Sequence, residues 1–441
     1  MQIAGLIVYF LSIIAFFAAM QVNYRKQHLD VFYFALPIIF VLAQSLYVLP
    51  LAFRGAFEID FNSQISPLYY EFSSHVPYAV MLTAVFNLIF TFFYVALPVR
   101  SENIFGKKRK PVPMGALVFL LVICLLMIYK VAMGYGGLIS YILLGYKVVE
   151  TFAGATEYVV AFNWLIVVAI VYLYIGYLSK DRKKIINGLF AIGVLILVFA
   201  IMGRRGVLVV LCAAAVGGYH LLVKKVPFGL LLVGVFLSFF ALSFIGLTRG
   251  ESYSSVEQIG QIIGERGRAA SSLGISIFYT LIDGNFAVPF ETFPQVIKNL
   301  RGDIGIGFGE YSLRALLFFI PNALWENRPL PLSNWYVAEF YGEDQLHVGR
   351  QFFILTAPYM DGGVFGVIIF GFLMAVLLRW IARFAQRGRD DPVVMAGVIL
   401  FMASMLNLIS NDLLGFSVAF FKTFILPLIF LHLCRKIRVS K

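Results

Sequence analysis

Charged side chains are scarce in this sequence of 441 residues, because aspartate, glutamate, lysine and arginine together make up only 13% of it. Soluble globular domains carry about 25% of these residues. Apolar residues instead account for 61% of the chain, and the mean hydropathy is +0.89. This composition excludes an ordinary soluble domain and indicates a protein that crosses a membrane several times.

Cysteine is also scarce, with three residues in the whole chain. Cys124 and Cys212 fall within apolar runs, and Cys434 lies close to the C-terminus. This distribution excludes a disulfide framework of the kind that holds small secreted domains together. The sequence also lacks internal repeats and low-complexity tracts, so it predicts a single membrane domain over 1–441.

Long apolar runs are what the chain has in abundance. A helix needs about 20 apolar residues to cross a hydrocarbon core of roughly 30 Å, and runs of that length recur along the whole sequence. We therefore expect an all-α polytopic membrane protein with about eleven transmembrane helices. The expected cores are 3–22, 31–53, 76–98, 113–133, 158–178, 185–203, 206–223, 227–247, 355–382, 393–411 and 413–433.

The basic residues cluster in alternate short connections between these runs. The clusters are Arg25 with Lys26, Arg100 to Lys110, Lys180 to Lys184, Lys224 with Lys225, Arg379 to Arg389, and the C-terminal tail. Cytoplasmic loops carry such a positive excess, so the pattern predicts an outer N-terminus and an inner C-terminus. The net charge of +12 then reflects membrane orientation, and no basic face for nucleic acid is expected.

One connection, 248–352, is far longer than the others and is predicted on the outer side. Long loops are where binding and catalysis are expected. The segment holds seven arginines but one lysine, with aromatic residues between them. Aromatic faces stack on sugar rings, which favours a carbohydrate groove; the alternative is that these aromatics anchor the loop at the membrane interface. Its apolar stretch around Pro321 is too short to span and predicts a re-entrant or surface-lying helix.

The stretch "MGRRGVLVV" at 202–210 places Arg204 and Arg205 between two apolar runs on the predicted outer side. The glycines on both sides allow a sharp turn, and the next helix is expected to begin near Gly206. Guanidinium groups beside a helix amino end form an anion site. The anion is either a lipid headgroup or outer-loop carboxylate, or the phosphate of a bound ligand.

Three segments, in this order, resemble the Wzy-type O-antigen and oligosaccharide repeat-unit polymerases of Gram-negative bacteria. They are "MGRRGVLVV", "IPNALWENRPLP" in the long loop, and "LTAPYMDGGVFGVIIFGF" at the start of the next helix. The matching steps are Gly203 to Gly206, Pro321 to Pro329 and Tyr359 to Gly366. Asp361 with Gly362 and Gly363 departs from the more usual polar–aromatic step. Gly362 and Gly366 also have the spacing of a helix-packing face.

The resemblance implies a GT-C-like glycosyltransferase, independent of metal and without a cofactor, in the bacterial inner membrane with its active site facing the periplasm. It would polymerise oligosaccharide repeat units carried on undecaprenyl pyrophosphate into O-antigen or a related surface polysaccharide. The implied partners are these lipid-linked oligosaccharides, membrane lipid and a chain-length-regulating co-polymerase, with no nucleic acid.

The implied site residues fall into three groups. Negative charge builds on the pyrophosphate as it leaves the anomeric carbon, and the groups expected to stabilise it are Arg204, Arg205, Arg249, Arg266, Arg268 and Arg301. The acceptor hydroxyl must lose a proton, and the catalytic candidates are His347, Arg350, Glu310 and Glu339. The glycan-binding candidates are Trp325, Arg328, Trp335 and Tyr359. His347 and Arg350 are expected to line one cavity with Arg249.

Two alternatives stay open. An O-antigen ligase, which transfers glycan to the lipid A–core, shares the implied fold, but its histidine would align with Phe352 and His347 is five residues away. The other is a lipid-linked oligosaccharide flippase or another transporter. Transporters usually carry internal repeats and binding groups near the bilayer midplane, whereas the polar residues here gather at the outer edge.

Overall fold

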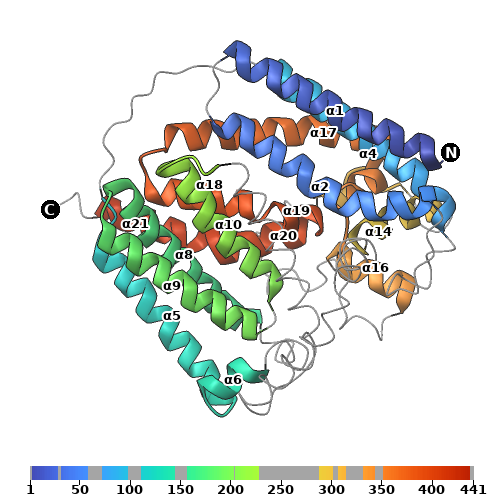
Figure 1. Ribbon diagram of the computed structural model, residues 1–441. Helices are drawn as coiled ribbons and strands as arrows, with labels where there is room; N and C mark the ends of the chain where they lie inside the picture. The colour runs from blue at the N-terminus through green and yellow to red at the C-terminus, as the bar shows by residue number, and fades with distance from the viewer. Residues whose placement is uncertain are drawn as a thin grey trace, which may run out of the picture. The chain divides into compact units, whose positions relative to one another are not determined.

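The computed structural model is helical throughout the part of the chain that it describes, and it contains no strand there (Figure 1). The described residues are 2–27, 31–57, 72–97, 111–144, 156–202, 204–227, 288–300, 306–313, 331–342 and 351–437. Within them, eight helices are long and apolar enough to cross a membrane. The chain is therefore an all-α protein with the character of a polytopic membrane protein.

These eight helical spans each overlap one predicted core. They are Ile3–Asn23, Val31–Ala56, Ser73–Ala96, Met114–Gly134, Ala161–Ser179, Arg182–Ile201, Thr356–Arg387 and Gly415–Arg435. The predicted core at 206–223 is also a helix, α10 (Arg205–Leu222), but its apolar part is shorter than the others. The predicted core at 227–247 lies outside the described residues.

The predicted core at 393–411 is interrupted. Helix α18 (Pro392–Ala403) ends at Ser404, and a separate short helix, α19 (Met405–Ile409), follows it. The amide of Ser404 donates to the carbonyls of Leu400 and Phe401, and its ψ of 4° leaves the helical range. Because nearly all of its neighbours are apolar, composition alone does not reveal this break.

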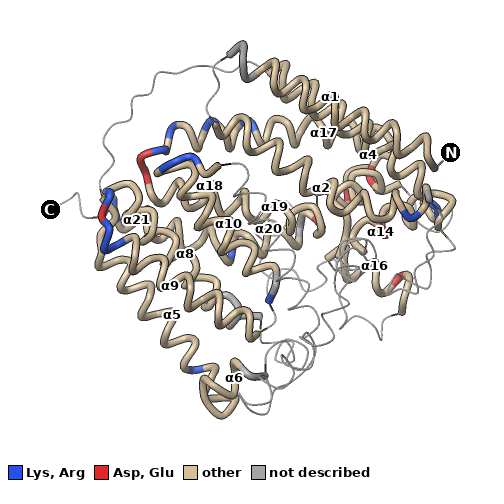
Figure 2. The backbone as a smooth tube through the Cα atoms, in the orientation of Figure 1, with Lys and Arg blue, Asp and Glu red and all other residues tan. Residues whose placement is uncertain are grey.

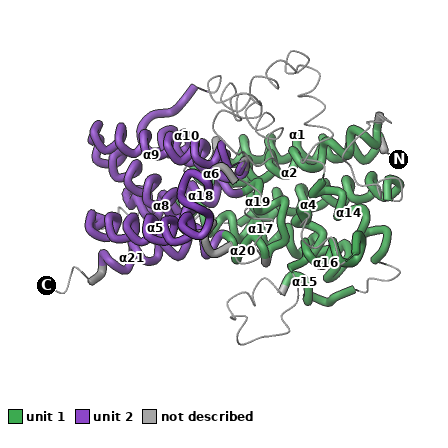
Figure 3. Tube along the Cα trace, turned by 90° about the horizontal axis from the view of Figure 1, so that it is seen from below, with its two compact units in different colours: residues 1–103, 278–386, 405–419 green, residues 104–277, 387–404, 420–441 purple. Residues whose placement is uncertain are grey.

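Two compact units make up the chain (Figure 3). Unit 1 comprises Met1–Asn103, Phe278–Gln386 and Met405–Ala419, and unit 2 comprises Ile104–Ile277, Arg387–Ser404 and Phe420–Lys441. Neither unit is one continuous stretch of sequence.

Three long helices form the first part of unit 1: α1 (Gln2–Gln27), α2 (Val31–Phe57) and α4 (Val76–Ala96), which follows the 3-10 turn η1 (Ser73–His75). Helix α1 packs along α4 and also contacts α2. Phe16, Phe40, Phe86 and Phe90 pack together in this core, and the Tyr9 hydroxyl donates to Ser45 Oγ at 3.1 Å.

Unit 1 also contains short helices from the predicted long loop. They are α14 (Val288–Asn299), α15 (Glu310–Leu313) and α16 (Leu332–Tyr341). Helix α14 packs on α2, α4 and η1, and its side chains from Pro289 to Ile297 are all buried. The unit is completed by α17 (Thr356–Arg387), α19 and α20 (Leu413–Phe420).

Unit 2 is built around a hairpin of α8 (Thr156–Ser179) and α9 (Arg182–Ile201). Its other helices are α5 (Met114–Gly134), α6 (Leu138–Leu144), α10, α18, the π-helix η6 (Phe421–Ile425) and α21 (Leu426–Ile437). The hairpin is close-packed at Gly188, where a Cβ atom would lie 3.0 Å from the backbone of Leu173. The Tyr174 hydroxyl of α8 donates to the carbonyl of Ala214 in α10 at 2.6 Å.

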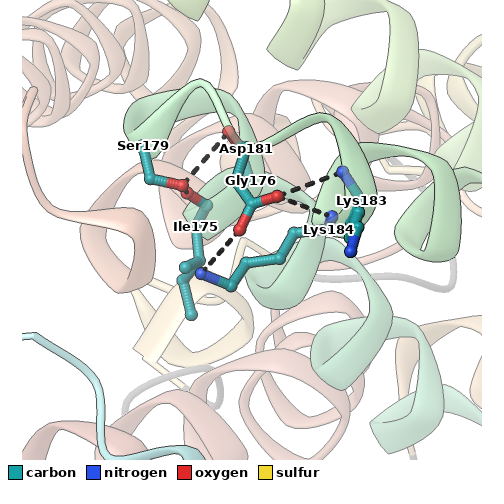
Figure 4. Close-up of polar contacts among 6 residues, drawn as sticks. All are labelled: Ile175, Gly176, Ser179, Asp181, Lys183 and Lys184. Atoms are coloured by element: carbon teal, nitrogen blue, oxygen red, sulfur yellow. Dashed lines mark hydrogen bonds and ion pairs between the residues drawn. The ribbon is translucent and has the colours of Figure 1, made fainter.

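The turn between α8 and α9 explains why α9 begins where it does (Figure 4). Asp181 Oδ1 accepts hydrogen bonds from the amides of Lys183 and Lys184 at 3.0 and 3.4 Å, and Lys184 Nζ lies 3.0 Å from Asp181 Oδ2. A carboxylate at this N-cap position satisfies amides that the helix leaves without partners. The side-chain hydrogen bond from Lys184, followed by the amide bonds, lowers the pKa of Asp181.

Charged residues lie mainly at the ends of the described helices, and the middles of the helices are nearly free of charge (Figure 2). Helix α17 is typical, because its basic residues follow its long apolar stretch. This arrangement keeps charge out of the hydrocarbon core.

Candidate functional site

The junction between α9 and α10 is as tight as the sequence predicts. Helix α9 ends at Ile201 and α10 begins at Arg205. The amide of Met202 donates to the carbonyl of Val198 and the amide of Arg204 to that of Phe199, both at 3.0 Å. With so short a connection, the two arginines stay next to the ends of two apolar helices.

Arg204 is the N-cap residue of α10. Its φ and ψ of −89° and 74° are not helical, and its carbonyl accepts a bond from the amide of Leu208 at 3.4 Å. Its half-buried side chain makes no capping hydrogen bond. The amides of the first turn and the helix dipole therefore point to the region around the arginines, which suits an anion. The Arg205 side chain lies outside the described residues.

Aromatic rings lie beside this junction in unit 2. Tyr141 of α6 stacks on Phe162 at a centroid distance of 5.9 Å, and Phe162 contacts Phe199 at 6.0 Å. Burial raises the pKa of Tyr141 and the positive charge of Arg204 lowers it, so the guanidinium lies within electrostatic reach of this phenol. Sequence reasoning missed the cluster, because it depends on how α6 folds back toward α9.

The "DGG" step in unit 1 forms a kink near the start of α17. Gly362 and Gly363 leave the helical conformation, and Gly363 has a φ of 59°, which favours glycine. A Cβ atom at Gly366 would overlap the carbonyl oxygen of Pro358 in the same helix. Gly363 and Gly366 therefore allow the kink, and within the described residues no atom lies within 4 Å of an added Cβ at Gly362.

Asp361 holds a loop against this kink. Its buried carboxylate accepts hydrogen bonds from the amides of Tyr311 at 2.8 Å and Ser312 at 2.7 Å. The amide of Gly307 also donates to the carbonyl of Met360 at 3.0 Å. Both carboxylate oxygens are engaged by backbone amides, so Asp361 acts here as an anchor for the segment 306–313.

The anchored segment carries part of the predicted site. The Tyr311 ring lies 6.1 Å from that of Trp335 on α16, and both are partly exposed. Glu310 precedes Tyr311, and Glu339 follows Trp335 by one helical turn; both acidic side chains are exposed. The predicted residue Trp335 thus forms an aromatic pair with Tyr311, and the predicted residues Glu310 and Glu339 lie on the same two short helices, α15 and α16. We call these four side chains the aromatic surface.

The predicted glycan residue Tyr359 lies elsewhere in unit 1. Its side chain is 8% exposed and its ring meets that of Phe293 edge-on at 5.6 Å. Tyr359 therefore packs in the interior against Phe293 of α14, and it is not one of the exposed side chains of the aromatic surface.

Buried polar residues position α16, and sequence reasoning did not single them out. The Tyr336 hydroxyl donates to Gln295 Oε1 of α14, and Asp412 Oδ2 accepts from the amide of Ser333 at 3.2 Å. Glu291 of α14 is also buried, at 1% exposure. In the sequence, these residues differ from their surroundings only in being polar within a strongly apolar chain. Burying such side chains is costly unless they form hydrogen bonds.

Many predicted site residues lie outside the part that the structure describes, so their roles stay predictions. They are His347, Arg350, Arg249, Arg266, Arg268, Arg301, Trp325 and Arg328. Among the described residues, no group of histidine, cysteine, aspartate and glutamate side chains is arranged to hold a metal ion.

Comparisons with protein-family models, with curated proteins and with solved structures found no match to this chain.

Proposed function

We propose that this chain is a glycosyltransferase of the bacterial inner membrane that polymerises oligosaccharide repeat units carried on undecaprenyl pyrophosphate, on the periplasmic side. The observation that carries the proposal is the pair Arg204 and Arg205 at the amino end of α10, with too short a connection to move away from the bilayer. A pyrophosphate joined to a lipid tail is an anion held at that depth. Guanidinium groups bind such oxygens in a bidentate manner.

The reaction explains why arginines are needed. A hydroxyl of the incoming repeat unit attacks the anomeric carbon of the growing chain and forms the new glycosidic bond. The bond from that carbon to the pyrophosphate oxygen breaks, and its electron pair stays on the departing undecaprenyl pyrophosphate. Arg204, Arg205 and the amides of α10 stabilise this developing charge.

The side chains of the aromatic surface in unit 1 are of the types that bind sugars, which favours a glycan substrate. The rings of Tyr311 and Trp335 offer apolar faces for sugar C–H groups, and the exposed carboxylates of Glu310 and Glu339 accept hydrogen bonds from hydroxyls. A carboxylate is also a suitable acceptor for the proton that the attacking hydroxyl loses. His347 and Arg350 remain the other proposed catalytic residues.

Deletion of the gene in its own host tests the proposal. A polymerase mutant should make surface polysaccharide with core plus one repeat unit, seen as a single short band on a gel. Bare core would instead favour the ligase or the flippase. Wild-type polysaccharide would contradict a role in this pathway.

Side-specific labelling tests the outer location of the aromatic surface. In a variant without native cysteines, single cysteines replace Lys107, in a predicted inner connection, or Glu310. A membrane-impermeant thiol reagent applied to spheroplasts should label position 310 and leave position 107 unlabelled. Labelling of both positions, or of neither, would contradict the proposed orientation.

A further inference from the structure

A buried arginine joins α17 to the end of α4 in unit 1. Arg379 is 3% exposed, and its Nε donates to the carbonyl of Tyr94 at 2.6 Å. Its Nη2 donates to the carbonyls of Tyr94 and Val95. These carbonyls belong to the last turn of α4, where a cation is favourable because it opposes the helix dipole.

Three donors around this arginine are left without an acceptor among the described residues. They are Arg379 Nη1, Arg383 Nε and the hydroxyl of Tyr33, all of them buried atoms. The Tyr33 ring lies 5.8 Å from the Arg379 guanidinium carbon, and the side chain of Tyr33 is 1% exposed. Unsatisfied buried donors cost about 1–3 kcal/mol each, more when charged, so such a group is expected to have a partner.

Two of these three donors belong to basic side chains. Arg379 and Arg383 are one helical turn apart on α17, so two positive charges lie close together along this helix. Neither forms an ion pair with a carboxylate in the described part of the chain. A ligand that brings negative charge and several acceptor oxygens would satisfy all three donors, which is the chemistry of a phosphate group.

We propose that Arg379, Arg383 and Tyr33 form a binding site for the phosphate of an anionic phospholipid. A lipid is favoured as the source because Trp380 and Phe384 lie on the same stretch of α17, are 60% and 43% exposed, and stack at 5.8 Å. Exposed aromatic pairs next to basic residues are typical of the membrane interface, where headgroups lie. The site is built from residues of unit 1 alone and does not depend on the proposed reaction.

Lipid binding to the purified full chain tests the site. Native mass spectrometry should show phosphatidylglycerol retained in preference to phosphatidylcholine. Arg383→Gln and the isosteric Tyr33→Phe each remove one donor while leaving the clamp of Arg379 on α4 intact. We expect Arg383→Gln to weaken phosphatidylglycerol binding about tenfold and Tyr33→Phe to weaken it less. The matched control is Lys183→Gln, which removes one exposed positive charge elsewhere and should change nothing.

Three results would overturn the proposal. They are equal retention of the two lipids, equal loss of phosphatidylglycerol in the Lys183→Gln control, and wild-type binding in both Arg383→Gln and Tyr33→Phe. A second experiment measures whether inorganic phosphate, added to the protein in detergent, competes with phosphatidylglycerol. If it competed with phosphatidylglycerol at equal concentration, the site would be a free-phosphate site and the lipid assignment would be wrong.

Discussion

The α9–α10 junction and the kink of α17 are both breaks next to long apolar helices, but they differ in whether a charged side chain binds backbone amides. At the kink, both carboxylate oxygens of Asp361 accept hydrogen bonds from backbone amides, and these bonds hold the segment 306–313 in place. At the junction, the Arg204 side chain makes no capping bond, and the amides of the first turn of α10 have no capping side chain from it.

This difference suggests different roles for the two breaks. The kink of α17 positions a loop, whereas the α9–α10 junction is suited to binding a ligand. Glycine supplies the kink with the backbone freedom that it needs, and the anchored loop then holds the Tyr311–Trp335 pair in place. The junction instead combines a helix amino end with positive side chains, which is the combination that binds phosphates. Substitutions should therefore impair activity at the junction and stability at the kink.

The largest expected effect is at the junction. Arg205→Ala should reduce polymerisation on the order of 10²- to 10³-fold, because one donor to the developing oxyanion is lost. Arg205→Lys should also impair it, since lysine keeps the charge but lacks the bidentate fork. The readout is polysaccharide length on a gel, with the amount of protein in the membrane as the control. If both the Arg204→Ala and the Arg205→Ala variants made wild-type polysaccharide, the proposed role of these arginines in stabilising the departing pyrophosphate would be contradicted.

At the kink, Gly366→Ala should destabilise the protein by about 1–3 kcal/mol, because its Cβ atom would overlap the Pro358 carbonyl. The measurement is thermal unfolding in detergent. Gly193→Ala is the matched control, since Gly193 lies inside the regular helix α9 and no atom lies within 4 Å of the added Cβ. Equal effects of the two substitutions would show that the steric account of the kink is wrong.

Asp361→Asn should cost about 1–2 kcal/mol, because an amide offers one acceptor oxygen to the two amides that the carboxylate now satisfies. Faster proteolysis of the segment 306–313 should accompany the loss of stability. Full retention of polymerisation in a folded Asp361→Asn protein would agree with an anchoring role. A complete loss of activity with unchanged unfolding temperature would instead assign the carboxylate to the chemistry.

The smallest effect is expected at the turn between α8 and α9. The pKa of Asp181 is lower in the folded protein, so its stabilisation is present above the unfolded value of about 3.9 and is lost as the pH falls through the lowered value. Asp181→Asn keeps a good capping residue and should remove this pH dependence, whereas Asp181→Ala should also lose the cap. Unfolding temperatures at pH 7 and pH 3 check this, and an Asn variant with wild-type pH dependence would contradict it.

The class of the protein and most of its long helices could be predicted from the sequence, because the backbone of a long apolar run has to form its hydrogen bonds within a helix. Eight predicted cores coincide with helices of membrane-spanning length. The tight junction at Arg204 was also predictable, since only a few residues separate two apolar runs and glycines flank the arginines. These features depend on residues that are close together in the sequence, so they can be predicted from it.

Which polar groups contact one another could not be predicted from the sequence, because the contacts join distant parts of the chain. Asp361 binds amides about 50 residues away, Tyr336 reaches Gln295 on another helix, and Arg379 reaches the end of α4 from a position 285 residues later. No local pattern specifies such pairs. A buried polar group forms its hydrogen bond with whichever partner the packing brings within range. The identity of that partner therefore depends on the whole fold. The break at Ser404 inside a predicted span has the same origin, because apolar composition allows a helix without requiring it to be continuous.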